Sequence, residues 1–254
     1  MSGKIGGLQA KVKEISPNAL YIHCCAHNLN LNLIDSVQSC IRAILFFGTH
    51  ETLYIFLSGS LPRLHVLQEE QEKQMNGIIL TLKRLSDTRW TSHKRAVEVV
   101  HSSIPCIIDT LTKIADGDIP NTKAKTVADA NGLIANILTL EFMFLLKFWV
   151  YVLDCVHTLS QYLQSSSIDL TTYESFINTC FSDILGMRND STFEKITQEA
   201  IEISKICGGP EVFKGTRTQK RRFLDEMIND SVVQDARERF KIEVFYVLLD
   251  VFTN

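Results

Sequence analysis

The densest group of residues able to do chemistry lies between Thr81 and Val100. This stretch holds five cations against two carboxylates, although the whole chain of 254 residues carries a formal charge of only -3. The cations are Lys83, Arg84, Arg89, Lys94 and Arg95, and Trp90 stands among them. Lysines and arginines bind phosphates, and an indole ring stacks on an unpaired base. The stretch therefore predicts contact with nucleic acid, and a plain solvated surface is the other interpretation.

Other candidate sites are incomplete. Cys24 and His27 have the C-x-x-H spacing of half a zinc site, but the remaining histidines and cysteines offer no second close pair. A cysteine nucleophile needs a base close in space, which adjacency in sequence does not provide. Cleavage by two metal ions needs several carboxylates converging on one point, and no such set is visible. We therefore predict no metal site, no cofactor and no catalytic residue.

A second basic cluster, Arg217–Arg222, reads RTQKRR. It either contacts phosphates or serves as a nuclear address, and a solvated loop is the default interpretation. The surrounding segment 207–222 also contains paired glycines and a proline, so it is predicted to be a flexible loop.

Composition indicates a globular, largely helical chain. Hydrophobic residues make up 45% and charged residues 22%, which suits a sizeable core, while five prolines and twelve glycines are few for this length. Seven cysteines, an odd number, favour reduced intracellular thiols. The most apolar run, Phe142–Leu153, is too short to span a membrane and contains Lys147. We interpret it as a buried helix and expect no membrane association.

The elements that position these residues follow from periodicity. Helical spacing covers 4–15, a segment from Ala26 that breaks near Gly48, and Pro62–Lys73. Ala19–Cys24 is predicted to be a buried strand, and an extended Met75–Leu85 is favoured over a helix. Asp87 or Thr88 is predicted to cap a helix from Trp90 to Ser102. From Ser103 onward only helical periods occur, at 104–115, 121–138, 140–164, 171–188, 191–206 and 233–252.

Four segments, in order, resemble the hAT-superfamily transposases, in particular their domesticated, zinc finger MYM-type-like members. They are HCCAHNLNLNLIDSV (23–37), LKRLSDTRWTSHKRAVEVV (82–100), LSQYLQSSSIDL (159–170) and RTQKRRFLDEM (217–227). The resemblance implies a ribonuclease-H-like catalytic domain split by an all-helical insertion, with an Asp-Asp-Glu triad binding two divalent metal ions.

Individual positions carry over from this resemblance. Cys24 and His27 match the family's C-x-x-H motif, and Leu29 and Asn30 match the H-x-L-N pattern that follows it. The Arg-Trp dipeptide matches Arg89 and Trp90, which the resemblance places at the cleaved transposon end, with the indole stacking on a base of the DNA hairpin.

The departures from the family pattern decide the expected function. Met1-Ser2-Gly3 matches the end of a Y-D-G-A-A-N-M-S-G segment, so both catalytic aspartates are expected before residue 1. The catalytic Glu and the dimerisation region are expected beyond the last helix, and the N-terminal zinc-finger module is missing. The chain is therefore expected to be a fragment that is not an enzyme, and two divalent metal ions are expected only in a complete family member.

Together these observations predict a mostly α fold with a small β part. Residues 1–102 are expected to form an incomplete ribonuclease-H-like α/β domain, and residues 103–254 an all-helical insertion domain. The predicted function is a transposase-derived, nuclear, nucleic-acid-binding domain with DNA as its partner. The alternatives are a helical protein–protein interaction module with a vestigial DNA surface, or a fragment without independent function.

Overall fold

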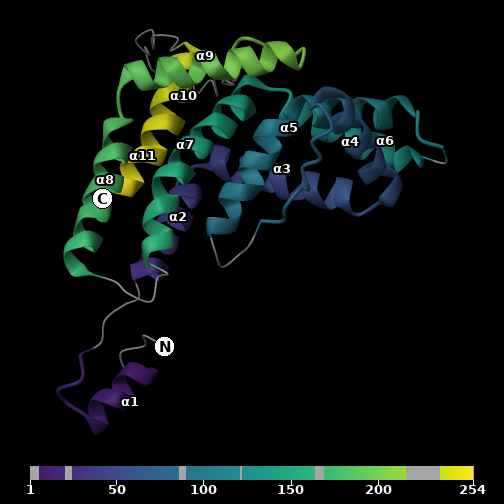
Figure 1. Cartoon of the computed structure of the whole chain (residues 1–254). Coiled ribbons are helices and arrows are strands. Elements are labelled where there is room, and N and C mark those ends of the chain that lie inside the picture. Colours follow the sequence, from purple (N-terminus) through teal and green to yellow (C-terminus); the bar gives the residue numbers. More distant parts are fainter. Residues whose placement is uncertain are drawn as a thin grey trace, which may run out of the picture.

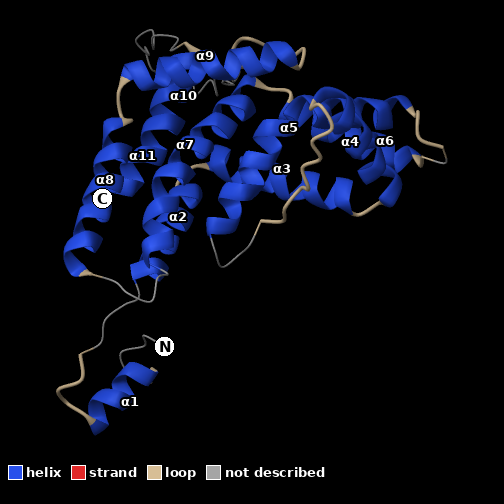
Figure 2. Cartoon of the chain, in the orientation of Figure 1, coloured by secondary structure: helices blue, strands red, loops and turns tan. Residues whose placement is uncertain are grey.

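The computed structural model describes residues 6–20, 25–85, 90–120, 122–163, 169–215 and 235–253. All regular secondary structure in these ranges is helical (Figure 2). The elements are α1 (Leu8–Ile15), α2 (Cys25–Gln38), α3 (Ile41–Ser58), α4 (Leu61–Gln74), α5 (Trp90–Asp116), α6 (Ala124–Ile137), α7 (Leu140–Leu163), α8 (Leu170–Gly186), α9 (Asp190–Ile206), α10 (Ala236–Phe240), the π-helical turn η1 (Lys241–Tyr246) and α11 (Val247–Thr253).

The predicted fold class is therefore wrong in its β part. The mostly α character is confirmed, but the described residues contain no strand and no ribonuclease-H-like sheet. A strand is stable only beside another strand that satisfies its backbone groups, and a single short apolar segment has none. Leu20, at the described end of the predicted strand Ala19–Cys24, is 89% exposed. Residues 21–24 of that prediction lie outside the described ranges.

The segment after α4 is non-helical, but a side chain takes the place of a neighbouring strand. The Gln71 amide donates to the carbonyl of Leu80 and accepts from its N–H, both at 3.1 Å. Farther on, the N–H of Leu85 donates to Glu51 at 3.3 Å. Leu82, between them, is buried. Segment 78–85 is thus held against α3 and α4 without any sheet.

Two long helices, α5 and α7, form the centre of the body. In one arm, α4 and α6 pack along α5, and α3 packs against α4 and α6; in the other, α2 and α8 pack on α7, and α11 packs against α2 and α8 (Figure 1). Helix α9 packs on α7 beside α10. Helix α1 stands apart, beyond the end of the body where α2 begins. The body is one continuous apolar core rather than a sheet covered by helices.

Two predicted helix boundaries are wrong. Helix α5 continues through Pro105, so the predicted division between residues 102 and 103 falls inside it. A proline inside a helix removes one backbone hydrogen bond. Burial along one face of α5 offsets this loss, at Val97, Val100, Ile104, Ile107 and Leu111. The break between α2 and α3 lies at Ser39 and Cys40, and Gly48 is inside α3.

Aromatic rings fill the centre of the core. The ring of Phe144 on α7 lies 5.2 Å from Phe193, 5.1 Å from Phe240 and 5.8 Å from Phe245. In a regular α-helix, residues five apart point roughly 140° away from each other. The wider π turn of η1 brings Phe240 and Phe245 to the same side, so both reach Phe144.

The first half of the predicted flexible loop 207–222 is packed. Phe213 is buried, and its ring lies 4.7 Å from that of Phe240. The Ser204 hydroxyl donates to the carbonyl of Pro210 at 2.7 Å. A Cβ on Gly209 would lie 2.6 Å from that hydroxyl oxygen and 2.9 Å from a methyl carbon of Leu138, so a larger residue would force these side chains to shift. Residues 216–222 lie outside the described ranges.

The interpretation of Phe142–Leu153 as a buried helix is confirmed. Helix α7 is long and apolar enough to cross a membrane, but most of it is covered by other helices. The core helix of a globular protein passes the same test. Phe148 and Trp149 are fully buried, and Phe47 of α3 packs on Trp149 at 5.0 Å between ring centres.

Truncation of a central side chain is expected to be costly. Leu146 of α7 is fully buried, so Leu146→Ala leaves a cavity and should lower the free energy of unfolding by about 2–5 kcal/mol. Leu185 of α8 is 49% exposed, and Leu185→Ala should cost less than about 1 kcal/mol. Urea unfolding followed by circular dichroism measures both. Equal losses for the two variants would contradict the central place of α7.

Candidate nucleic-acid interface

The described cations among the predicted nucleic-acid contacts fall into two groups: paired cations, which form ion pairs with other described residues, and open cations, which are exposed and form none. Arg84 belongs to the paired group, because its Nε donates to Glu51 Oε1 of α3 at 2.9 Å. Its side chain is 68% exposed, so the pair lies at the surface. Together with the Leu85 N–H, this contact fixes the end of segment 78–85 on α3. Arg84 therefore holds the segment in place.

Lys94 is a structural cation. Its side chain is only 20% exposed, and its Nζ lies 2.9 Å from Asp154 of α7 and 3.4 Å from Glu98. Burial lowers the pKa of Lys94, but the hydrogen bond and charge of Asp154 outweigh burial and raise the pKa overall. Lys94 thus stays protonated and ties the start of α5 to α7. Its ammonium is not presented to solvent as a phosphate contact.

Lys83 and Arg95 are the open cations of the set. Both are exposed, and neither forms an ion pair with another described residue. Arg89 lies outside the described residues, as does the side chain of Trp90, whose backbone begins α5. The chain therefore brings Lys83 and Arg95 to the two sides of one junction, where segment 78–85 leads into the N-terminus of α5.

Three of the four family-motif residues lie on α2, and they face different surroundings. His27 is exposed, and Leu29 lines an apolar groove beside α7 and α8. Asn30 lines a small cavity together with Lys94 and Ser160, so it lies next to the start of α5. Cys24 is outside the described residues. Among the described residues, no three metal-ligating side chains converge.

Sequence reasoning missed a pair of buried histidines behind this junction. His50 of α3 is 1% exposed, and neither of its ring nitrogens has a hydrogen-bond partner in the described part of the chain. His93 of α5 is also buried, and its ring lies 5.7 Å from that of Phe47. Burial, followed by the charge of His93, lowers the pKa of His50 to about 4. The signal was available, because His50 follows Phe46 at helical spacing on an apolar helix.

This arrangement can bind an anion but shows no catalytic machinery within the described residues. Lys83 lies in the segment that precedes α5 in sequence, and Arg95 lies in the second turn of α5, near a helix N-terminus whose backbone dipoles favour negative charge. Among the described residues, His93 is the charged group that acts on His50. Phosphate binding is therefore the chemistry that the junction supports.

Comparison with known proteins gives no assignment: no family model and no solved structure matches the chain.

The buried imidazole of His50 predicts a loss of stability in acid. The native state holds His50 neutral, so its contribution is fully present above the unfolded-state pKa of about 6.5 and is lost as the pH falls toward 4. The lowering to about 4 corresponds to about 3 kcal/mol. His50→Phe should therefore reduce the fall in unfolding free energy between pH 7 and 4 by about this amount.

Urea unfolding at the two pH values tests this, with His27→Phe at an exposed position of α2 as the control. The control should show the wild-type fall in stability. A His50→Phe variant that loses as much stability in acid as the wild type would show that His50 is accommodated when charged.

Proposed function

We propose that this chain is a helical, transposase-derived nucleic-acid-binding module of the hAT type. DNA binds at the junction between segment 78–85 and α5. The observation that carries the proposal is the exposure of Lys83 and Arg95 on the two sides of that junction, without ion-pair partners among the described residues. The resemblance of 82–100 to the hAT family supports the same assignment.

In this proposal the described residues of the junction have two roles, phosphate contact and positioning. Lys83 and Arg95 neutralise phosphates, which supplies the sequence-independent part of affinity. Arg84 and Lys94 position them, because the Glu51 and Asp154 pairs fix the two sides of the junction to α3 and α7. Arg89 and Trp90 stand between these anchors in sequence and are the expected contacts with a DNA end. In this proposal the module binds DNA in the nucleus without cutting it and needs no cofactor.

Removal of the two open cations tests the proposal. Lys83→Ala/Arg95→Ala should weaken binding to hairpin DNA and reduce the slope of log K against log salt concentration by about 1.5–2, since two phosphate contacts are lost. Fluorescence anisotropy over a range of salt concentrations measures both quantities.

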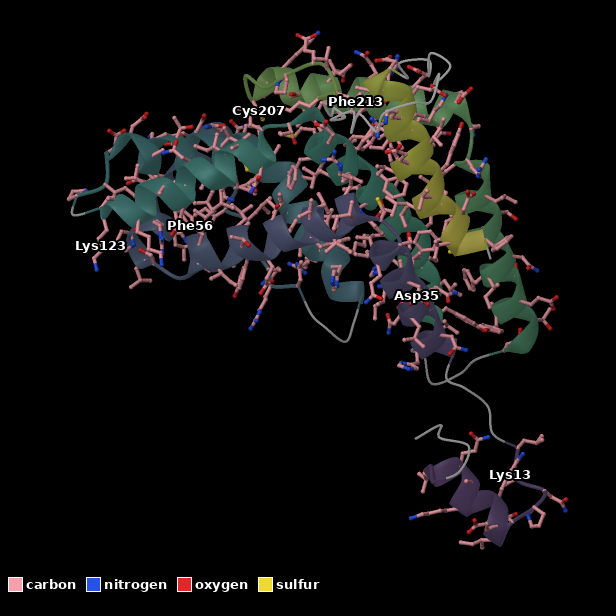
Figure 3. All side chains as sticks on the ribbon, turned by 180° about the vertical axis from the view of Figure 1, so that it is seen from behind. Lys13, Asp35, Phe56, Lys123, Cys207 and Phe213 are labelled. Atoms are coloured by element: carbon pink, nitrogen blue, oxygen red, sulfur yellow. The ribbon has the colours of Figure 1, made fainter. Side chains whose placement is uncertain are left out.

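A matched control is Lys123→Ala/Lys125→Ala at the start of α6. Both lysines are exposed, and Figure 3 shows Lys123 at the far tip of the arm. The control should bind DNA as the wild type does. Equal weakening by both double variants would reduce the interaction to general electrostatics and remove the junction as the site.

A second candidate function, a protein–protein interaction module, rests on a different surface. Helix α3 buries one face in the core but exposes apolar residues on the opposite face, with Ile41 64%, Ile44 43% and Ile55 55% exposed. These residues share a stripe at helical spacing, and Gly48 at its centre has open space around it. Contiguous exposed apolar surface of this kind is typical of protein interfaces.

The α3 stripe gives a direct test of this second function. Ile44→Asp/Ile55→Asp should abolish capture of a protein partner in a pull-down that survives nuclease treatment, because charges in the stripe oppose its burial. The thermal unfolding curve should change little, since both side chains are largely exposed. Retention of the partner by this variant would rule out the stripe, and dependence of capture on nucleic acid would favour the DNA junction.

A further inference from the structure

Helix α1 has an apolar face that nothing in the described structure covers. Leu8, Val12 and Ile15 recur at the spacing of one helix face, and they are 60%, 43% and 87% exposed. Helix α1 has only eight residues, and no residue in it is buried. Isolated helices of this length are marginal in water. The helical state of α1 therefore calls for a surface on which it packs.

An apolar groove lies at the end of the body nearest α1 (Figure 1). It runs between α2, α7, α8 and α11 and has a volume of about 190 Å³. Roughly 10–15 Å³ of such space is enough for one water molecule, so this groove has room for several side-chain groups. Its lining includes Leu29, Leu159, Leu163, Ile177, Phe181 and Phe252. Phe181 is 42% exposed, so apolar surface remains open to solvent there.

The charges of the groove and of α1 are complementary. The walls of the groove, which are α2, α8, α11 and residues 152–163 of α7, contain no lysine or arginine. Exposed carboxylates on these walls are Asp35 on α2, Asp154 on α7, and Glu174 and Asp183 on α8, and of these Asp154 is paired with Lys94. Helix α1 carries two lysines against one glutamate. Lys11 is three residues after Leu8 and four before Ile15, so it borders the apolar stripe and would meet an acidic rim.

The connection between the two surfaces is short. Nine residues, Ser16–Cys24, separate α1 from α2, and such a segment spans at most about 30 Å when extended. Asn28 and Leu29, in the first turn of α2, already line the groove. Helix α1 is itself only about 12 Å long. A tether of this length gives the helix a high effective concentration at the groove of its own chain.

We propose that α1 docks into this groove of its own chain. Leu8, Val12 and Ile15 enter the groove, and Lys11 lies toward the carboxylates at its edge. This is the helix-in-groove mode of recognition, in which apolar residues at helical spacing anchor an amphipathic segment. The occupant is thus a short, lysine-bearing amphipathic helix. Helix α1 has this character, and its short tether keeps it close to the groove.

Hydrogen exchange of the full chain, followed by mass spectrometry of a peptide covering residues 6–16, tests the docking. In the wild type, the amides of α1 should exchange at least about tenfold more slowly than those of an unstructured peptide, at every protein concentration. Val12→Asp in the helix and Phe181→Asp in the groove should each abolish this protection. Ile206→Asp, at a 73% exposed position of α9 away from the groove, is the matched control and should preserve it.

Three results would overturn the proposal. The first is exchange of the wild-type α1 amides at unstructured rates. The second is protection that survives Phe181→Asp while circular dichroism shows the body folded, which would place α1 on another surface. The third is protection that rises with protein concentration together with a dimer in sedimentation velocity, which would assign the groove to α1 of a second copy. None of these results depends on DNA binding.

Discussion

The burial of α7 on nearly all sides is the constraint on which the rest of the body depends. Phe142, Phe144, Phe148 and Trp149 of this helix contact rings from α3, α9, α10 and η1, so one helix organises elements from both ends of the chain. Aromatic side chains bury the most area per residue and prefer the tilted and edge-on contacts seen here. The polar contacts are arranged around this core, and the Lys94 pair with Asp154 attaches the start of α5 to it.

This core also explains the irregular features at the C-terminal end. Phe213 reaches the aromatic cluster from a loop that closes over Gly209, and Phe245 reaches it because η1 is wound more widely than an α-helix. The Ser36 hydroxyl of α2 donates to the carbonyl of Leu248 at 3.1 Å inside the body. Residues more than two hundred positions apart therefore complete one packing unit.

Much of the helical content could be predicted from the sequence, because apolar residues at spacings of three and four are a local signal. The strand at Ala19–Cys24 could not be judged in this way, since a strand depends on a partner that may be distant in sequence. Gln71 illustrates the difficulty. Its side-chain amide makes with Leu80 the two hydrogen bonds that a neighbouring strand would make, and no hydrophobic periodicity in the sequence predicts this contact. The predicted boundary after Ser102 was wrong, because helical spacing lies on both sides of it and α5 continues through Pro105.

The candidate site, like the fold, could be predicted from the sequence only in part. The cationic cluster was visible from composition, but two neighbouring residues differ in their surroundings, because Lys94 is partly buried in ion pairs and Arg95 is exposed. Successive residues on a helix point about 100° apart, and only the position of α7 decides which one faces Asp154. The helical spacing of His50 after Phe46 indicated a buried position, but it could not show that the ring nitrogens lack hydrogen-bond partners among the residues that the structure describes. Its partner-free burial appears only when α3 and α5 are packed together.

The uninterrupted course of α5 has a mechanical consequence. A helix of 27 residues is about 40 Å long and behaves as a stiff lever. Its first turn lies at the basic junction, and its far half carries α4 and α6. A tilt of about 5° at the first turn would move the far end by roughly 3.5 Å, from the length of the helix alone. Such a tilt would have to be accommodated where α5 packs along α7, since Lys94 and Asp154 join the two helices near the junction.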